Sequence, residues 1–288
     1  MNDALHTVRL TDHAVTLLDL PPEPSSGQSS PDRTLPPLVL LHGGGGDHRM
    51  WSRQYHSFPE RRVVIPDARG HGGSTGATES HRLVDDLVEL LDGLGIERAV
   101  VAGISMGGGT AVDLALEFPE RCAGLLISGT GTSEPTFTDP WSHARFAAMA
   151  AAAEANDPDA WVEAFMQFYY GPSRNRGDLS PEVVELLESM VRDTVAAMPR
   201  DPQGNLVPPQ GPTPVLNTWE RASGITVPVL ALNGELDSPD HLENGRRLAE
   251  TVPDGQYSEI PGAAHCPNLE NPVDYGRQVR EFLREQGI

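Results

Sequence analysis

The feature that most constrains the fold is a short run that passes from an apolar segment through glycines into a helical pattern. Residues 99–118 read AVVAGISMGGGTAVDLALEF. β-prone residues lead to Gly103, and alanine and leucine recur at helical spacing after Gly107. This pattern predicts a strand, a sharp turn that holds Ser105 in a strained conformation, and a helix. Gly103 and Gly107 lack a Cβ atom, which allows the strand and the helix to pack closely around the serine.

A serine at this position is suited to nucleophilic chemistry. It stands at a helix N-terminus, where free backbone N–H groups and the helix dipole favour a developing negative charge. The pattern Gly-x-Ser-x-Gly alone is weak in a chain with 29 glycines among 288 residues, so the flanking strand and helix carry the inference. The alternative interpretation is a glycine-rich turn without chemistry.

Short apolar strands alternate with helices on both sides of this turn. Strands are predicted at 38–41, 62–67, 98–103 and 125–128, a helix at 80–94 with Ser80 as its cap, and a short helix at 50–58. Wholly apolar strands suit a parallel sheet that is covered on both faces. We therefore predict an α/β fold with a doubly wound, mostly parallel sheet, whose ligand site lies at the carboxyl ends of the strands. Residues 6–20 predict an N-terminal antiparallel hairpin, and Pro21 to Pro37 an extended surface loop.

The segment from Gly129 to Gly224 breaks this alternation. Helical patterns occupy 139–155, 157–170 and 180–198, and a Pro/Gly-rich run follows from Pro199 to Pro214. Strands then return at 227–232 and 256–260, with helices at 242–251 and 275–286. We predict an α/β core formed by residues 1–132 and 223–288, with a helical lid inserted over residues 133–222.

The lid segment carries most of the aromatic residues of the chain. Trp141, Trp161 and Phe165 are candidates for the wall of an apolar substrate pocket. For each of them, ordinary packing between lid and core is the alternative interpretation.

A reactive serine needs a histidine base and a carboxylate that orients the base. After a turn of this type the acid comes first and the histidine second, each just past the end of a strand. Asp237 and His265 occupy these places. The rival acids are Glu235, Asp240 and Asp139. The rival bases are His6, His13, His143 and His241, of which His241 is expected on a helix.

The run His42-Gly43-Gly44-Gly45-Gly46-Asp47 follows the strand at 38–41. Its glycines allow backbone N–H groups to point into a cavity and to stabilise an oxyanion. We assign one donor to Gly44 and the other to Met106, the residue after the serine, and expect Gly43 beside the substrate. A flexible loop is the alternative. His71, in a second glycine-rich loop, is expected to order that loop by hydrogen bonding.

The sequence gives little support to metal or cofactor chemistry. His42, Asp47 and His48 are close together, but no HExxH or CxxC spacing occurs and no Gly-x-Gly-x-x-Gly loop follows the first strand. We predict no metal and no cofactor. Cys122 is expected in the core, and Cys266, next to His265, is not expected to pair with it.

The net charge of −20 argues against nucleic acid and anionic lipid as partners. No apolar run approaches the roughly 20 residues of a membrane span, the N-terminus shows no basic-then-apolar signal pattern, and two cysteines form no disulfide framework. A cytoplasmic location is therefore expected. The sequence leaves a homo-oligomer open.

Together these motifs resemble the α/β-hydrolase family over residues 38–285. The matching segments are HGG at 42–44, DARGHGGS at 67–74, GISMGG at 103–108, GELD at 234–237 and GAAH at 262–265. Within the family, SMGG followed by HCPNLENP is similar to enol-lactone hydrolases, small esterases and cofactor-free perhydrolases.

The resemblance implies a Ser105, Asp237, His265 triad with Gly44 and Met106 as oxyanion donors. It implies hydrolysis of a small carboxylic ester or lactone with an apolar part, through an acyl-serine intermediate. Perhydrolysis, C–C bond hydrolysis and thioester hydrolysis use the same groups and stay open, as does a ligand-binding protein that does not catalyse.

Overall fold

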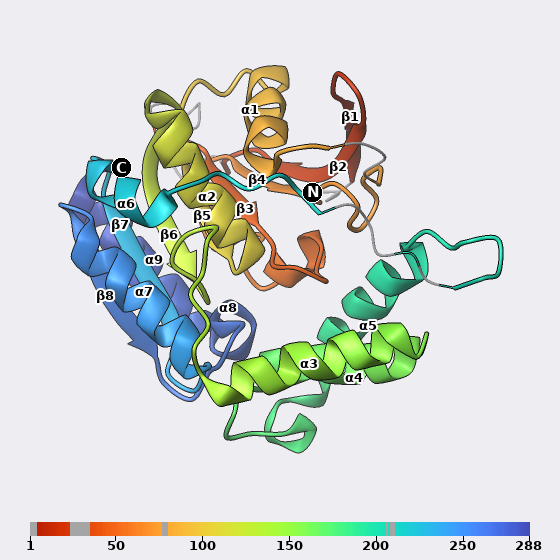
Figure 1. Cartoon of the computed structure of the whole chain (residues 1–288). Coiled ribbons are helices and arrows are strands. Elements are labelled where there is room, and N and C mark those ends of the chain that lie inside the picture. The colour runs from red at the N-terminus through yellow and green to blue at the C-terminus, as the bar shows by residue number, and fades with distance from the viewer. Residues whose placement is uncertain (1–4, 24–34, 77–79, 206, 208–210) are drawn as a thin grey trace.

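The computed structural model describes residues 5–23, 35–76, 80–205, 207 and 211–288. Within these residues an eight-stranded sheet forms the centre of the molecule, in the order β1-β2-β4-β3-β5-β6-β7-β8 (Figure 1). β2 pairs antiparallel with β1 and β4, and all other neighbours are parallel. The strands are β1 (His6–Arg9), β2 (Ala14–Leu20), β3 (Leu38–Leu41), β4 (Val63–Pro66), β5 (Ala99–Ile104), β6 (Cys122–Ser128), β7 (Val229–Gly234) and β8 (Gly255–Ile260). The predicted hairpin and the mostly parallel sheet are confirmed.

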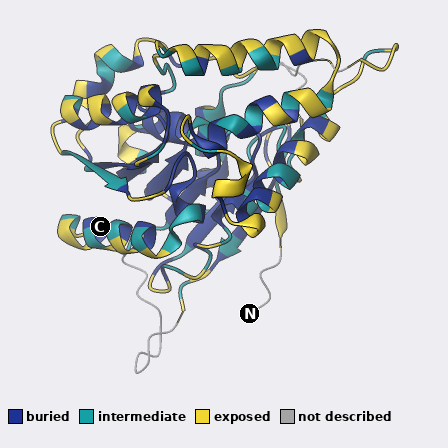
Figure 2. Cartoon of the chain, turned by 90° about the horizontal axis from the view of Figure 1, so that it is seen from below, coloured by how far each residue is buried: buried dark blue, intermediate teal, exposed yellow. Residues whose placement is uncertain are grey.

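Both faces of the sheet are covered, as the wholly apolar strands predict. Leu38 and Leu40 belong to one apolar cluster, and Val39 and Leu41 belong to the other, because successive side chains of a strand point to opposite faces. The cluster that contains Val39 is closed by α1 (Leu83–Gly93), α2 (Met106–Glu117) and α7 (Pro239–Thr251). The cluster that contains Leu38 is closed by α9 (Pro272–Gln286) and other segments. Figure 2 shows the buried strands between helices whose outer sides are exposed.

Three helices from the middle of the chain form a separate layer (Figure 1). They are α3 (Pro140–Glu154), α4 (Pro158–Tyr170) and α5 (Pro181–Ala197), which agree with the predicted helices to within one or two residues. Asp139, Asp157 and Ser180 cap them, and a proline follows each cap, an arrangement that satisfies otherwise free N–H groups. Met166 of α4 and Leu187 of α5 are buried in the cluster that contains Leu38. That this layer acts as a lid with limits at 133 and 222 stays a prediction.

Four predicted helix starts are wrong. Helices α7 and α9 begin at Pro239 and Pro272, three residues before the predicted starts at 242 and 275. The segment 50–58 is a short 3₁₀ helix, η1 (His48–Trp51), followed by turns. Helix α1 begins at Leu83, and its cap position is Arg82, without a side-chain cap bond, instead of Ser80.

Several short helices lack a signal in the sequence patterns. They are η2 (Pro119–Arg121), η3 (Arg176–Asp178), α6 (Thr218–Arg221), η4 (Ala222–Gly224) and α8 (Pro267–Glu270). Cys122 is fully buried at the start of β6, as expected. The surface loop predicted for 21–37 lies largely outside the described residues, and the Pro/Gly-rich run 199–214 lies partly outside them.

Candidate active site

The turn between β5 and α2 holds Ser105 in a strained conformation. Its φ of 51° and ψ of −113° lie in a region that residues with a side chain rarely adopt. A Cβ atom on Gly103 would lie 2.2 Å from the Gly107 carbonyl oxygen, and one on Gly107 would lie 2.5 Å from the Leu41 carbonyl oxygen. Neither position could therefore carry a side chain unless the backbone around it moved. Ser105 itself is half-buried at the N-terminus of α2.

Asp237 and His265 meet at the ends of β7 and β8. The Nδ1 atom of His265 lies 2.9 Å from Oδ2 of Asp237, and both residues are buried. Burial raises the pKa of the Asp237 carboxyl, but the neighbouring imidazoles and their hydrogen bonds outweigh burial and hold this pKa well below its usual range. Because a carboxylate only accepts hydrogen bonds, Nδ1 of His265 carries the proton and Nε2 is left as the basic nitrogen.

Backbone contacts connect Ser105 to His265. The Ser105 N–H group donates to the Ser128 carbonyl at 2.8 Å. The next residue, Gly129, lies against the imidazole: a Cβ atom there would be 2.6 Å from Cε1 and 3.4 Å from Nε2 of His265. The hydrogen bonds of these described residues include none between the Ser105 hydroxyl and His265. Such bonds are often long without substrate, and a closed triad stays a prediction.

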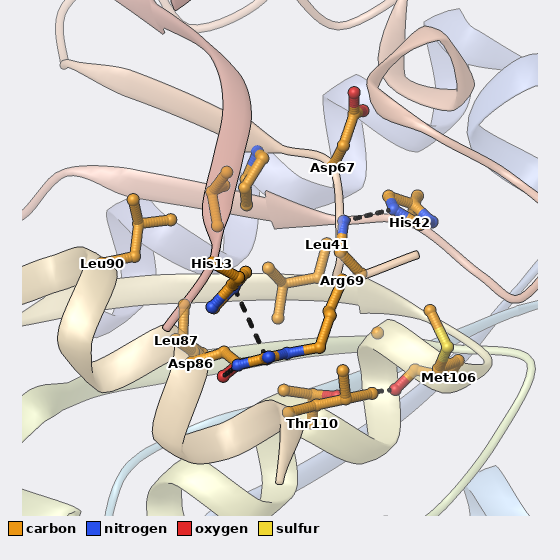
Figure 3. A pocket seen from close by; sticks show the side chains of 15 residues that line it. His13, Leu41, His42, Asp67, Arg69, Asp86, Leu87, Leu90, Met106 and Thr110 are labelled. Atoms are coloured by element: carbon orange, nitrogen blue, oxygen red, sulfur yellow. Dashed lines mark hydrogen bonds and ion pairs between the residues drawn. The ribbon is translucent and has the colours of Figure 1, made fainter. Parts of the chain in front are cut away.

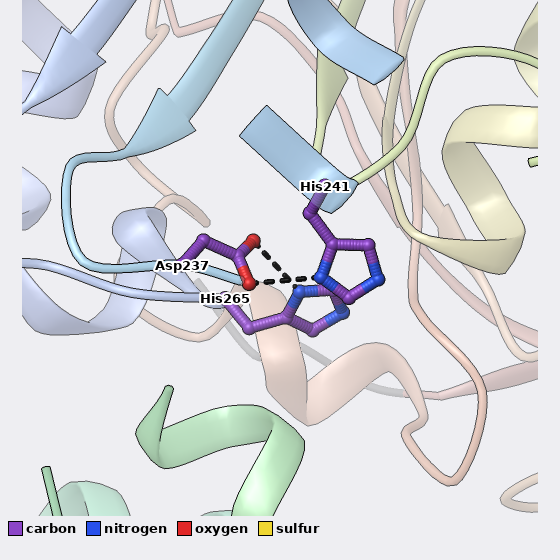
Figure 4. Close-up of side chains that lie close together, drawn as sticks. All are labelled: Asp237, His241 and His265. Atoms are coloured by element: carbon purple, nitrogen blue, oxygen red, sulfur yellow. Dashed lines mark hydrogen bonds and ion pairs between the residues drawn. The ribbon is translucent and has the colours of Figure 1, made fainter. Parts of the chain in front are cut away.

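Sequence reasoning missed the contact between His241 and Asp237. As predicted, it lies on a helix, but its Nδ1 atom is 2.9 Å from Oδ1 of Asp237, so one carboxylate contacts two imidazoles (Figure 4). Ser238 caps α7 and accepts the His241 N–H at 3.3 Å. The sequence spacing could have indicated this contact. His241 is the third residue of α7, and a side chain at that position points back toward the residues that precede the helix.

The rival acids have other contacts. Asp240 accepts the N–H groups of Thr138 and Asp139, and Asp139 caps α3. Glu235 is exposed and accepts the Gly262 N–H at 3.0 Å. Among the candidates, Asp237 is the carboxylate in contact with a histidine of the strand-end loops.

Hydrogen bonds order the glycine-rich loop after β3. His42 donates from Nδ1 to the Gly43 carbonyl at 2.8 Å and accepts the Ala68 N–H at Nε2 at 2.9 Å. Burial lowers the pKa of His42, in keeping with a neutral structural residue. The Tyr169 hydroxyl of α4 donates to the Gly44 carbonyl at 3.1 Å. No hydrogen bond of the described loops and caps uses the N–H groups of Gly44 or Met106, so their use as oxyanion donors stays a prediction.

Two cavities adjoin the serine turn. One of about 330 Å³ is lined by Ser105, Met106, His241 and the polar residues Thr130 and Asp113, among others. The other, about 310 Å³, shares Met106, Leu83 and Pro212 with the first and extends along Trp161 and Met198. Each is at the lower end of the size range for small-molecule sites.

The predicted substrate-binding residues differ in their placement. Gly43 lies beside the serine, since a Cβ atom on it would be 3.5 Å from Ser105 Cβ. Trp161 lines the second cavity. Phe165 stacks on Trp161 with ring centroids 5.1 Å apart but is not among the residues that line either cavity. Trp141 packs edge-on against Phe168 and is not among the residues that line either cavity.

A smaller cavity of about 50 Å³ lies behind the turn (Figure 3). Leu41, Leu87 and Leu90 line it together with Thr110, and Arg69 bridges Asp12 and Asp86 beside it. Its volume would hold one or two water molecules. It is therefore a packing void between the sheet, α1 and α2.

His71 bonds the Arg69 carbonyl at 3.1 Å and orders its loop, as expected.

Among the residues that the structure describes, two groups of side chains have metal-ligand spacing: Asp237 with His241 and His265, and Asp47 with His48 and Asp67. Protein groups already bond the atoms of the second group, because His48 donates to Asp67 and Arg49 to Asp47.

Cys266 is fully buried and burial raises its pKa well above the usual value, which makes it inert as a nucleophile.

The family of the chain follows from comparison with known proteins. A family model described as the alpha/beta hydrolase fold matches residues 36–272. The chain belongs to the α/β-hydrolase family. The resemblance seen in the sequence motifs is thereby confirmed.

None of the described helices is long and apolar enough to cross a membrane.

Relatives within the α/β-hydrolase family differ in the reactions for which they are named. 3-Oxoadipate enol-lactonase 1 of Acinetobacter baylyi is 24% identical over 94% of this chain and 97% of its own length. 2-Hydroxy-6-oxo-6-phenylhexa-2,4-dienoate hydrolase of Burkholderia cepacia is 26% identical over 85% of this chain and 87% of its own. The solved enol-lactonase of Burkholderia xenovorans LB400 has a TM-score of 0.72 at 22% identity, covering 97% of this chain and 100% of that one, which shows the shared fold.

Proposed function

We propose that this chain is a serine hydrolase that cleaves a small carboxylic ester or lactone through an acyl-Ser105 intermediate. The observation that carries the proposal is the buried Asp237–His265 pair. The imidazole of His265 packs on Gly129, beside the strained turn that holds Ser105. Enol-lactonases and esterases among the similar proteins support the same substrate class.

In the proposed mechanism, His265 removes the Ser105 proton as the serine oxygen attacks the substrate carbonyl. The N–H groups of Gly44 and Met106 stabilise the oxyanion, and the N-terminus of α2 adds its positive dipole end. His265 then gives the proton to the leaving alcohol. Water repeats the sequence on the acyl-enzyme and releases the acid. The substrate's apolar part would lie along Trp161 and Phe165, which stack on each other.

The test is covalent labelling with a fluorophosphonate probe. The wild type is expected to be labelled on Ser105, and Ser105→Ala is expected to show no label. Ester hydrolysis by Ser105→Ala or His265→Ala is expected to fall by a factor on the order of 10⁴ to 10⁶. Label on another residue of the wild type, or full activity of Ser105→Ala, would end the proposal.

C–C bond hydrolysis is the second candidate, because a relative similar over 85% of this chain is named for a 2-hydroxy-6-oxo-dienoate substrate. The polar end of the first cavity, with Thr130 and Asp113, favours an acyl group that carries oxygen atoms. Parallel assays with short esters, lactones, thioesters and β-diketones separate the two candidates by their kcat/KM values.

A further inference from the structure

Asp237 is shared between two imidazoles that have different origins. His265 comes from the loop after β8, and His241 comes from the first turn of α7. Each donates from Nδ1 to a different oxygen of the same carboxylate at 2.9 Å. The ring centroids are 4.4 Å apart and the ring planes differ by 34°, so the two imidazoles are close neighbours with tilted planes.

Holding the carboxylate in place does not require His241. The Ser238 N–H group already donates to Oδ1 of Asp237 at 2.7 Å, and His265 holds the other oxygen. The capping bond at the start of α7 uses only the backbone N–H of His241. A structural role therefore leaves the second ring nitrogen of His241 unexplained.

The His241 side chain borders the cavity that contains Ser105. In the neutral imidazole, Nδ1 of His241 carries the proton that bonds Asp237 and Nε2 keeps a free lone pair. No hydrogen bond among the described residues uses Nε2 of His241, although the side chain is only 6% exposed. Figure 4 shows the outer nitrogens of the two rings on the same side, away from Asp237, and His241 lines the cavity of about 330 Å³ that also contains Ser105.

Two neighbouring acceptors match the two donors of one water molecule. We propose that His241 is a further catalytic residue, which accepts the second O–H of the water that attacks the acyl-enzyme while His265 accepts the first. This inference rests on the proposed acyl-Ser105 intermediate. Holding both O–H groups fixes the direction of the oxygen lone pair that attacks the acyl carbon.

The step is a hydrolysis with an ordinary proton balance. The water oxygen bonds to the acyl carbon, and its proton passes to Nε2 of His265. The bond from the acyl carbon to the Ser105 oxygen then breaks, and His265 returns the proton to that oxygen. His241 gains and loses no proton. The single charge of the Asp237 carboxylate balances the single imidazolium that forms on His265.

The diagnostic variant is His241→Asn, assayed on p-nitrophenyl acetate. The Asn side-chain nitrogen reaches the place of Nδ1 and can still donate to Asp237, but nothing replaces Nε2. We expect acylation to persist and deacylation to slow by about tenfold, the usual effect of one hydrogen bond. The full-length variant should then show a burst of one nitrophenol per enzyme, and kcat and KM should fall together.

Methanol gives a readout that a structural role would not change. Methanol has one O–H group, so it needs His265 but gains nothing from a second acceptor. In His241→Asn the ratio of methanolysis to hydrolysis is expected to rise by about the same factor of ten.

His241→Gln places an amide oxygen farther out and is expected to restore hydrolysis in part. It also serves as the second test if His241→Asn folds poorly. His241→Phe removes both nitrogens and is the control for loss of the Asp237 contact.

An unchanged methanol ratio in His241→Asn, or a loss of kcat/KM without a burst, overturns this inference. Fluorophosphonate labelling of the wild type separates its failure from that of the proposed function. If the probe does not label Ser105, the acyl-enzyme proposal fails. If the probe labels Ser105 and the methanol ratio does not change, only the role of His241 fails.

Discussion

Gly129 offers the sharpest test of how the fold positions His265, the proposed base. Its φ of 64° is left-handed, and a Cβ atom there would lie 2.6 Å from Cε1 and 2.8 Å from Nδ1 of His265. Ordinary contacts begin at 3.4 Å. In Gly129→Ala the imidazole or the backbone must therefore shift by about 0.8 Å, the shortfall between 2.6 and 3.4 Å.

Such a shift acts on two contacts of His265. It strains the 2.9 Å bond to Asp237 and displaces Nε2 from the serine. A misplacement of about 1 Å in a catalytic group costs roughly 10²-fold in rate. We expect kcat/KM of Gly129→Ala for p-nitrophenyl acetate to fall by about 10²-fold. Left-handed strain in the alanine should also cost about 1–2 kcal/mol of stability.

Gly262→Ala is the matched control. Gly262 has a φ of 71°, and no atom lies within 4 Å of the position that an alanine Cβ would take there, so its alanine carries the same backbone strain without a contact. Gly262→Ala is expected to lose a few degrees in Tm from backbone strain alone. Gly129→Ala is expected to lose more, because of its added contact with His265, and only Gly129→Ala should lose activity. Equal kcat/KM values in the two variants would refute the argument that Gly129 sets the position of the base.

Two further predictions concern stability. Asp113 of α2 is buried, and burial raises its pKa to about 7 although Ser133 donates to it at 2.6 Å. Its folded pKa lies above the unfolded value, so Asp113 costs stability increasingly as the pH rises from about 4 to 7. Asp113→Asn should therefore gain up to about 4 kcal/mol at pH 8 and little at pH 4 in urea unfolding, and an equal change at both pH values would contradict this. Gly103→Ala places a Cβ atom 2.2 Å from the Gly107 carbonyl oxygen. We expect this variant to be insoluble, or to lose the near-UV circular dichroism of a packed core. A normal Tm would show instead that the turn can relax.

The parts of the fold that follow local patterns could be predicted from the sequence. The wholly apolar strands, the serine turn and helices α3 to α5 each carry their own signal, because period and capping residues coincide. Asp237 and His265 were predicted as acid and base because their order after the turn restricts the choice, and the structure brings the two side chains into contact; their catalytic roles stay a prediction.

Two of the incorrect helix starts depend on contacts between distant segments. The Ser80 hydroxyl bonds the Thr213 hydroxyl at 2.7 Å and is not available as a cap for α1. The Met50 carbonyl accepts from the Asn268 side chain at 2.8 Å, which competes with a continued helix after η1. Neither partner is visible in a local window of sequence, since tertiary contacts override local preference.

The residues proposed for chemistry and those proposed for substrate selection come from different parts of the fold. Ser105, Gly129, Asp237 and His265 follow the ends of β5, β6, β7 and β8, which are consecutive neighbours in the sheet. Their spacing is therefore set by strand register, which is determined by the buried core. The second cavity is instead walled partly by Trp161 of α4 and Met198 after α5. Because this helical layer can change without shifting the register of the strands, one set of reactive groups can serve several substrates. Such a separation is consistent with relatives at 24% and 26% identity that are named for an enol-lactone and for a 2-hydroxy-6-oxo-dienoate.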